Sequence, residues 1–296
     1  MFDIKWFHEA TSVEDAVEWL KKDEDAEVIS GGTDVLIRVR EGKDAGKAMV
    51  SVHNLKEIKG VSIDNNENII IGAGTNFYNI TNNEIIKNNI LSLSEACDTV
   101  GGPQIRQTGT IGGNICNGAT SADSASTMVA LDCDIVCVGP NGERVVPISE
   151  WYVGPGKTVR DRCEVVTKFI IKKENYKGYF GFYHKYGKRN AMEIATLGCS
   201  VLVKLSNDKK TIEDVKIAYG VAAPTPSRAK TAESFIKGKP VSDISVYEEF
   251  GKEALKDMNP RDSWRASKDF RIQLITELGK RSLMEAVKRA GGKINE

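Results

Sequence analysis

The 296-residue chain lacks any excess of charge and any long apolar run. Its 41 basic and 41 acidic residues cancel, whereas a dedicated nucleic-acid-binding protein normally carries a basic footprint. No apolar run approaches the ~20 residues of a membrane-spanning helix. The N-terminus also lacks the basic region, apolar core and small-residue cleavage site of a secretory signal. We therefore expect a cytoplasmic protein that binds no nucleic acid and has no membrane span.

Metal ligands and catalytic bases are also scarce. The chain has 3 histidines and 6 scattered cysteines, and no CxxC pair. Cys133 and Cys137 stand four apart in a predicted strand, which separates them too far for a compact ligand pair. We therefore expect no zinc or iron–sulfur site within the chain. The absence of GxSxG and HExxH motifs argues against a hydrolase, so no catalytic residue is assigned and redox chemistry would need another cofactor.

What the sequence does have is glycine, above all in residues 101–123, GGPQIRQTGTIGGNICNGATSAD. Apolar runs flank this stretch on both sides, which a flexible linker would not show. A glycine-rich turn embedded in a core indicates that the backbone comes close to another group. We interpret the stretch as holding the diphosphate and ring of a flavin nucleotide.

A second glycine turn, GGTD at 31–34, lies between a predicted strand at Val28 and a predicted helix from Val35. A strand, glycine turn and helix in succession suit an anion, because N–H groups at a helix start point toward it. Taken alone the motif is equally typical of a connecting turn, and it matches neither GxGxxG nor the Walker sequence.

The two glycine turns together suit a dinucleotide, whose two phosphates need several backbone donors. Thr33, Thr110 and Asn114 would add side-chain donors, and Asp123 would accept from a ribose or adenine edge. Lys185 lies between aromatic residues and either neutralises a cofactor charge or is an ordinary strand lysine with a solvated end. Cys116 is either reactive or, as is usual for cysteine, a small packing residue.

Local patterns also predict the order of elements. A capping box at Thr11–Glu14 begins a helix, and a hairpin turns at residues 140–142. A strong strand at 164–171 is followed by a charged turn, where we place a domain boundary near residue 176. Three long strands and three helices, the last from about 267 to 290, complete the chain.

Four segments carry a family resemblance: ISGGTDVL, GPQIRQTGTIGGNICNGATSADSA, GVAAPTPSR and SWRASKDFR. Together they resemble the flavoprotein subunits of molybdenum hydroxylases, a family that includes the FAD-binding subunit of xanthine dehydrogenase and its counterpart in carbon monoxide dehydrogenase. The similarity runs from Phe2 to Gly292. Its most specific motif is TIGGN, followed nine residues after its Asn by Asp123.

The resemblance implies an α+β fold. An FAD-binding domain of the vanillyl-alcohol oxidase/MurB type would occupy residues 1–176 in two lobes, about 1–55 and 56–176. A smaller C-terminal domain, a three-stranded antiparallel sheet with helices, would occupy 177–296.

The resemblance also implies non-covalent FAD and electron relay. Partner subunits would hold molybdopterin and two-iron clusters, and this chain would pass electrons from those clusters to NAD. The residues implied to hold the diphosphate are Val28, Ile29, Ser30, Gly31, Gly32, Thr33, Asp34, Val35, Thr110, Ile111, Gly112, Gly113 and Asn114. Val100 and Val166 would line the pocket, Asp123 and Lys185 would make polar contacts to the cofactor, and Cys116 and Asn117 would lie beside the isoalloxazine.

Several alternatives stay open at this point. The partner could hydroxylate nicotinate or another purine instead of xanthine, because no residue here touches that substrate. A carrier such as ferredoxin could replace NAD. A stand-alone flavin oxidase would need its own acid or base, which the few histidines disfavour, and intact glycine turns disfavour a scaffold without FAD.

Overall fold

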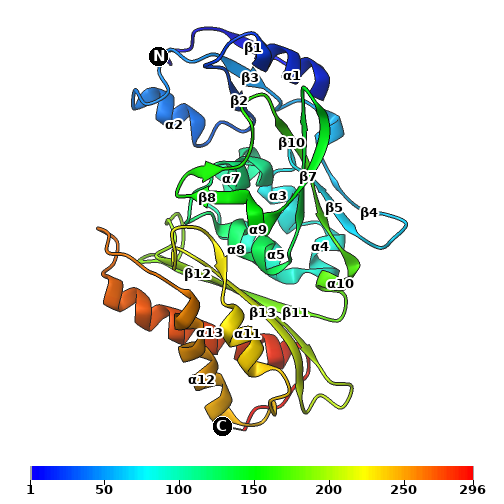
Figure 1. The fold of residues 1–296 in the computed structure, drawn as a ribbon, viewed down its shortest axis with the longest axis vertical. Coiled ribbons are helices and arrows are strands. Elements are labelled where there is room, and N and C mark those ends of the chain that lie inside the picture. Colours follow the sequence, from blue (N-terminus) through cyan, green and yellow to red (C-terminus); the bar gives the residue numbers. More distant parts are fainter. Residues whose placement is uncertain (1, 296) are drawn as a thin grey trace.

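The computed structural model describes residues 2–295. Its N-terminal lobe is a three-stranded parallel sheet in the order β1–β3–β2 (Phe7–Glu9, Met49–Ser51, Glu27–Ile29), with helices α1 (Val13–Lys21) and α2 (Val35–Arg40) (Figure 1). The capping box of α1 lies one residue later than predicted. Ser12 accepts from the amide of Asp15, and the Asp15 carboxylate, rather than that of Glu14, reaches back to the amide of Thr11 at 2.9 Å.

The middle lobe contains a five-stranded antiparallel sheet in the order β4–β5–β10–β6–β7. Its strands are Val61–Ile63, Ile69–Gly72, Val165–Ile171, Asp134–Gly139 and Gly142–Pro147. The predicted hairpin at 140–142 is confirmed, since Gly139 pairs with Gly142 between β6 and β7.

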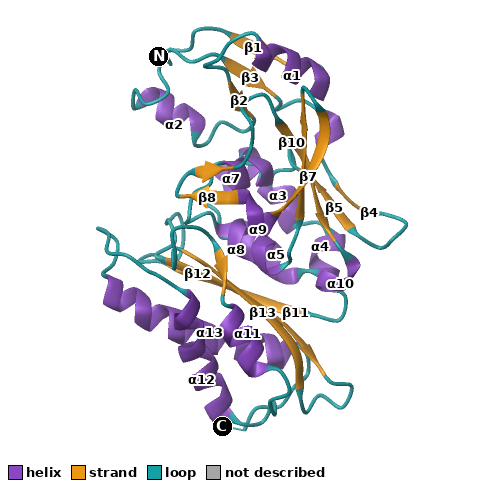
Figure 2. Ribbon diagram, in the orientation of Figure 1, coloured by secondary structure: helices purple, strands orange, loops and turns teal. Residues whose placement is uncertain are grey.

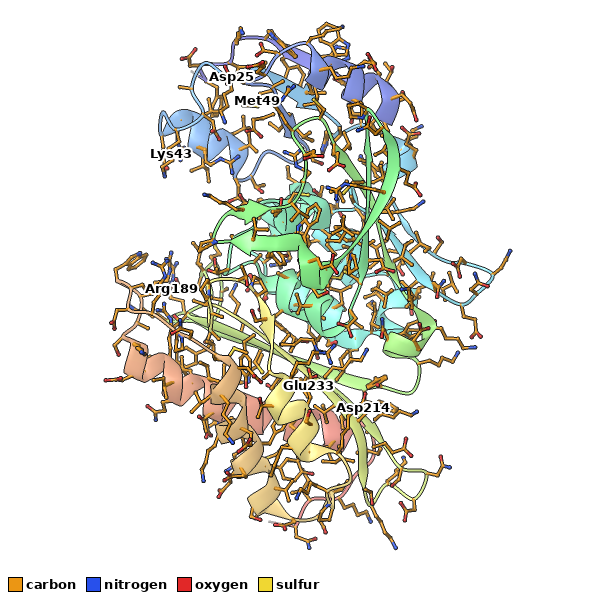
Figure 3. All side chains as sticks on the ribbon, viewed as in Figure 1. Asp25, Lys43, Met49, Arg189, Asp214 and Glu233 are labelled. Atoms are coloured by element: carbon orange, nitrogen blue, oxygen red, sulfur yellow. The ribbon has the colours of Figure 1, made fainter. Side chains whose placement is uncertain are left out.

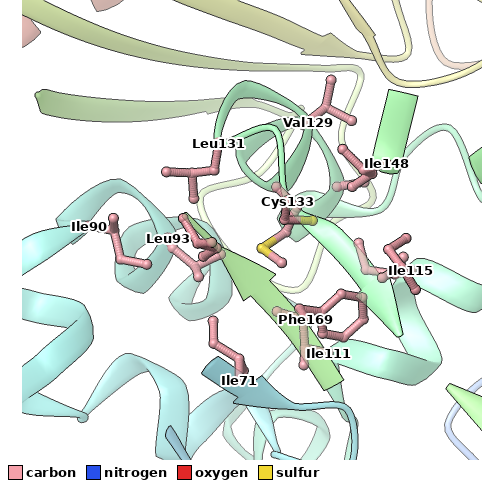
Figure 4. Packing of buried hydrophobic residues seen from close by; sticks show 14 of the residues in the cluster. Ile71, Ile90, Leu93, Ile111, Ile115, Val129, Leu131, Cys133, Ile148 and Phe169 are labelled. Atoms are coloured by element: carbon pink, nitrogen blue, oxygen red, sulfur yellow. The ribbon is translucent and has the colours of Figure 1, made fainter. Parts of the chain in front are cut away.

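Short helices pack on this sheet: α3 (Phe77–Thr81), α4 (Glu84–Asn89), α5 (Leu91–Asp98), α6 (Pro103–Thr108), α7 (Ile111–Cys116), α8 (Asp123–Ala130) and α9 (Ile148–Trp151). The strands β8 (Tyr152–Gly154) and β9 (Lys157–Thr158) form a small ribbon beside them. Figure 4 shows Phe169 of the sheet facing Ile111 and Ile115 of α7 across the core. Burial of these apolar side chains fixes α7 against the sheet.

The C-terminal part holds a four-stranded antiparallel sheet in the order β11–β12–β13–β14. β11 (Phe180–Tyr186), β12 (Leu197–Leu205) and β13 (Ile212–Gly220) are the three predicted strands, and β14 (Ser227–Arg228) adds a two-residue edge. Helices α11 (Lys230–Ile236), α12 (Ile244–Ala254) and α13 (Lys268–Arg289) pack with this sheet (Figure 2).

The other face of this sheet packs on the middle lobe. Leu202 and Ala218 belong to the middle lobe's apolar core, against which α5 and α8 pack. Helix α10 (Lys173–Tyr176) ends where we propose that the first domain ends.

A partly buried ionic network also joins the two parts. Arg228 donates to Asp132, just after α8, and binds Glu233 of α11 through two nitrogens at 2.6 and 2.7 Å. Figure 3 shows Glu233 beside this boundary. Removing one partner of such a network would leave an uncompensated charge. In the part of the chain that is described, no helix is both long and apolar enough to cross a bilayer.

Candidate cofactor site

A cavity of about 940 Å³ lies where the N-terminal lobe, the middle lobe and the loop after β11 meet. This is near the upper end of the roughly 300–1,000 Å³ typical of small-molecule sites. Its walls come from the GGTD turn, from α7 and the residues around it, from the start of β10, and from residues 192–194. The site therefore depends on three parts of the chain.

The GGTD turn forms the N-terminal wall and is held against the end of α6. A Cβ on Gly31 would lie 1.9 Å from the carbonyl oxygen of Thr108, so only glycine allows this close approach. Ser30, just before the turn, lines the cavity, and its buried hydroxyl has no protein partner among residues 2–295. A buried polar atom without a partner is costly unless a ligand or water satisfies it.

The TIGGN segment is a helix start, not the glycine turn that the sequence suggested. Thr110 caps α7 by accepting the amide of Gly113 at 3.1 Å, and Ile111 and Ile115 are fully buried. Capping and core packing together outweigh the low helix propensity of two glycines.

The two glycines of α7 have different surroundings. A Cβ on Gly112 would lie 2.6 Å from the carbonyl oxygen of Ala73. A Cβ on Gly113 would meet only the Thr110 hydroxyl oxygen, at 3.1 Å, and Gly113 lines the cavity. Gly112 thus permits tight packing, whereas Gly113 leaves space within the cavity.

Asn117 links α2 to the end of α7. Its side chain accepts from Arg38 at 3.0 Å and donates to Asp34 at 3.2 Å. Arg38 also pairs with Asp44 at 2.5 Å. Burial alone would raise the pKa of Asp44, but hydrogen bonds from Arg38 and Lys47 hold it below the usual range. This polar bridge fixes the wall formed by α2.

Asp123 lines the cavity at the start of α8. Its carboxylate accepts from Lys185 at 2.8 Å and from the Tyr183 hydroxyl at 3.0 Å, and Lys185 also donates to the carbonyl of Thr99 at 2.9 Å. The side chains of Asp123 and Lys185 are 8% and 10% exposed. Burial raises the pKa of Asp123, and the Lys185 ammonium opposes that effect.

The structure brings most of the predicted cofactor residues to this cavity. Ile29 and Ile111 instead point into the cores of the lobes. Lys185 lines a neighbouring cavity of about 310 Å³ and reaches the larger one through Asp123. Arg38 and Arg160 also line the larger cavity, and sequence reasoning missed both because neither belongs to a glycine motif.

Cys116 lies on the cavity wall but is a poor nucleophile. Burial raises the pKa of its thiol to about 11, despite the opposing charge of Arg160. A thiol with such a pKa is almost wholly protonated at neutral pH, and the thiolate is the reactive form.

Models of two protein families match nearly the whole chain. The FAD binding domain in molybdopterin dehydrogenase matches residues 2–172, and the CO dehydrogenase flavoprotein C-terminal domain matches residues 182–286.

Individual proteins are also similar to this chain over nearly its whole length. The chain is 37% identical over 294 residues to the xanthine dehydrogenase FAD-binding subunit of Escherichia coli O157:H7, covering 99% of this chain and 100% of that protein. It is 27% identical to the glyceraldehyde dehydrogenase medium chain of Sulfolobus acidocaldarius, over 93% of this chain and 96% of that one.

Among solved structures, a chain of carbon monoxide dehydrogenase from Hydrogenophaga pseudoflava superposes with a TM-score of 0.91 at 26% identity, over 98% of this chain and 99% of that one. The predicted fold class, a two-lobed α+β domain followed by a smaller domain with an antiparallel sheet, is confirmed.

Proposed function

Because the chain belongs to the family of FAD-binding subunits of molybdopterin dehydrogenases, we propose that it is the electron-transferring flavin subunit of a xanthine dehydrogenase. In this proposal it takes electrons from iron–sulfur clusters of a partner and reduces NAD. Bound FAD would supply the two-electron chemistry, and the protein would supply binding, orientation and electrostatics.

The cavity is the observation that carries the proposal. It is about 940 Å³ in volume. Its wall includes Gly113, which leaves space beside the helix, and the Ser30 hydroxyl, which has no protein partner among residues 2–295. An extended ligand with several hydrogen-bonding groups and a diphosphate fits these surroundings. The donor set therefore suits FAD.

Each wall has a distinct task in this proposal. Residues 28–35 and 110–114 would hold the diphosphate through backbone amides and through the Ser30, Thr33 and Asn114 side chains. Val100 and Val166, both on the cavity wall, would provide apolar contact. Asp123, held by Lys185, would accept a hydrogen bond from the cofactor.

We also propose that this chain functions as one subunit of a complex. The relatives are named as an FAD-binding subunit and as medium chains, which supports partners of larger and smaller size. We propose a large subunit with molybdopterin and a small subunit with two-iron clusters. The six unpaired cysteines suit the reducing cytoplasm that the sequence predicts.

Two measurements test the proposal. The first is the absorbance of the purified chain before and after heat denaturation and filtration, where release of FAD into the filtrate is expected. The second co-expresses the chain with a molybdopterin-binding subunit and an iron–sulfur subunit. Flavin bleaching is then followed with xanthine or nicotinate as donor, and flavin recovery with NAD as acceptor.

The outcomes separate the parts of the proposal. Bleaching by xanthine and recovery by NAD are expected. If only nicotinate bleaches the flavin, the proposed substrate becomes nicotinate instead of xanthine. If the flavin recovers only with a protein carrier, the proposed electron acceptor becomes that carrier instead of NAD. No flavin after reconstitution with excess FAD would refute the function altogether.

A further inference from the structure

We infer that Arg160 binds the diphosphate of the cofactor through its guanidinium group. This inference rests on the proposed function, since it assigns a residue to a cofactor that the function requires. No glycine motif contains Arg160, which lies in the turn between β9 and β10.

The inference starts from the charges on the cavity wall. Six carboxylates line the cavity, and five of them have a lysine or arginine nitrogen within 3.0 Å. The five are Glu27, Asp44, Asp123, Glu164 and Glu193. The sixth, Asp34, accepts the Asn117 amide at 3.2 Å. Five of the six acidic groups of the wall are thus already paired with a cation of the protein.

The two arginines of the wall, Arg38 and Arg160, differ in whether they form an ion pair. Arg38 pairs with Asp44 at 2.5 Å. Among the residues described, no carboxylate oxygen lies within 4.0 Å of a guanidinium nitrogen of Arg160, so Arg160 forms no ion pair. The charge of Arg160 also acts on the Glu164 carboxylate, but that carboxylate is itself paired with Arg144. A partly buried cation that makes no ion pair of its own would be stabilised by an anionic ligand.

The guanidinium of Arg160 is fixed on one side. One terminal nitrogen donates to the carbonyl oxygens of Asp161, Arg162 and Glu164, at 3.2, 3.4 and 2.7 Å. The remaining nitrogens have no protein acceptor among residues 2–295. A guanidinium held in this way keeps donors for a bidentate contact to phosphate.

Arg160 lines the same cavity as the two segments, 28–35 and 110–114, that we propose to hold the diphosphate. Its charge acts on Cys116, the neighbour of Asn117, and Asn117 holds Asp34 just before α2. The diphosphate is the only anionic group of oxidised FAD at neutral pH, so the unpaired cation has one matching partner on the ligand.

The test compares two flavins on the full-length chain freed of cofactor. FAD carries the diphosphate, whereas riboflavin has the same ring and ribityl chain without phosphate. Their dissociation constants are measured by flavin fluorescence at two salt concentrations, for the wild type and for Arg160→Gln. The matched control is Arg162→Gln, because Arg162 does not line the cavity and donates to the carbonyls of Leu20 and Asp23.

Arg160→Gln should raise the dissociation constant for FAD about 10- to 100-fold, the range for a charge-assisted hydrogen bond. The constant for riboflavin should stay within about twofold, and the salt dependence of FAD binding should fall because one charge is lost. Arg162→Gln should change neither constant. Arg160→Lys, which keeps the charge, should recover part of the FAD affinity and serves if the glutamine variant does not fold.

Two results would overturn the inference: unchanged FAD affinity in Arg160→Gln, or equal weakening of both flavins. A wild-type chain that binds no FAD would instead refute the proposed function, which the wild-type titration reveals by itself.

Discussion

Exchanging each glycine of α7 for alanine should separate packing from cofactor binding. Alanine is better in a helix than glycine by about 1 kcal/mol. In Gly113→Ala the new methyl group meets only the Thr110 hydroxyl oxygen, at 3.1 Å, so stability should be unchanged or rise by up to about 1 kcal/mol. In Gly112→Ala the methyl group lies 2.6 Å from a fixed backbone oxygen of Ala73. Overpacking of this kind costs about 1–3 kcal/mol, and the helix-propensity gain of about 1 kcal/mol offsets part of it, so a net loss of ~1 kcal/mol is expected.

The affinity for FAD should respond to these substitutions differently from the stability. Gly113 lines the cavity, so its alanine variant should weaken FAD binding by at least ~10-fold, about 1.4 kcal/mol, although the fold is intact. Urea unfolding of the cofactor-free proteins gives the stabilities, and FAD titration gives the affinities. A Gly112→Ala variant as stable as the wild type would show that the Ala73 contact is not restrictive. A Gly113→Ala variant with wild-type affinity would show that this glycine does not face the cofactor.

Three further predictions concern titratable groups. Asp123→Asn should cost about 3 kcal/mol because it strands the buried Lys185 charge, and adding Lys185→Met should recover part of the loss in a urea-unfolding double-mutant cycle. Native Cys116, whose pKa burial raises to about 11, should resist iodoacetamide at pH 7.5 and react after denaturation; rapid native labelling, read by mass spectrometry, would contradict this. Burial alone would raise the pKa of Glu164, but hydrogen bonds from Arg144 and a backbone amide lower it below 4.5. The contribution of Glu164 to stability is therefore complete above about pH 4.5 and is lost as the pH falls through its lowered pKa in the folded state. The unfolding free energy of the wild type should fall below about pH 4.5, and Glu164→Gln should make this fall less steep.

Much of the fold could be predicted from local patterns. The apolar stripe of α1, the hairpin at 140–142 and the three long strands of the C-terminal part all follow from periodicity and turn residues. α7 could not be predicted in this way, because two glycines in six residues disfavour a helix. Thr110 and the buried isoleucines that stabilise it act through a cap and through tertiary packing.

The position of the cavity, though not its occupant, could be predicted as far as the glycine motifs extend. Those motifs indicate where the backbone lies close to another group, and the cavity lies beside both of them. They do not indicate which group is close: for Gly31 it is the carbonyl of Thr108 in α6. Arg38 and Arg160 escaped sequence reasoning because their place on the wall depends on how separate lobes assemble.

The three-part construction of the cavity has a consequence for the synthesis of the protein. Residues 28–35 leave the ribosome early, the α7 wall follows some eighty residues later, and the last wall segment is 192–194. A nascent chain that has folded only its first lobe offers one open wall and cannot enclose a cofactor. A cavity closed by all three walls therefore exists only after about two thirds of the chain has been translated.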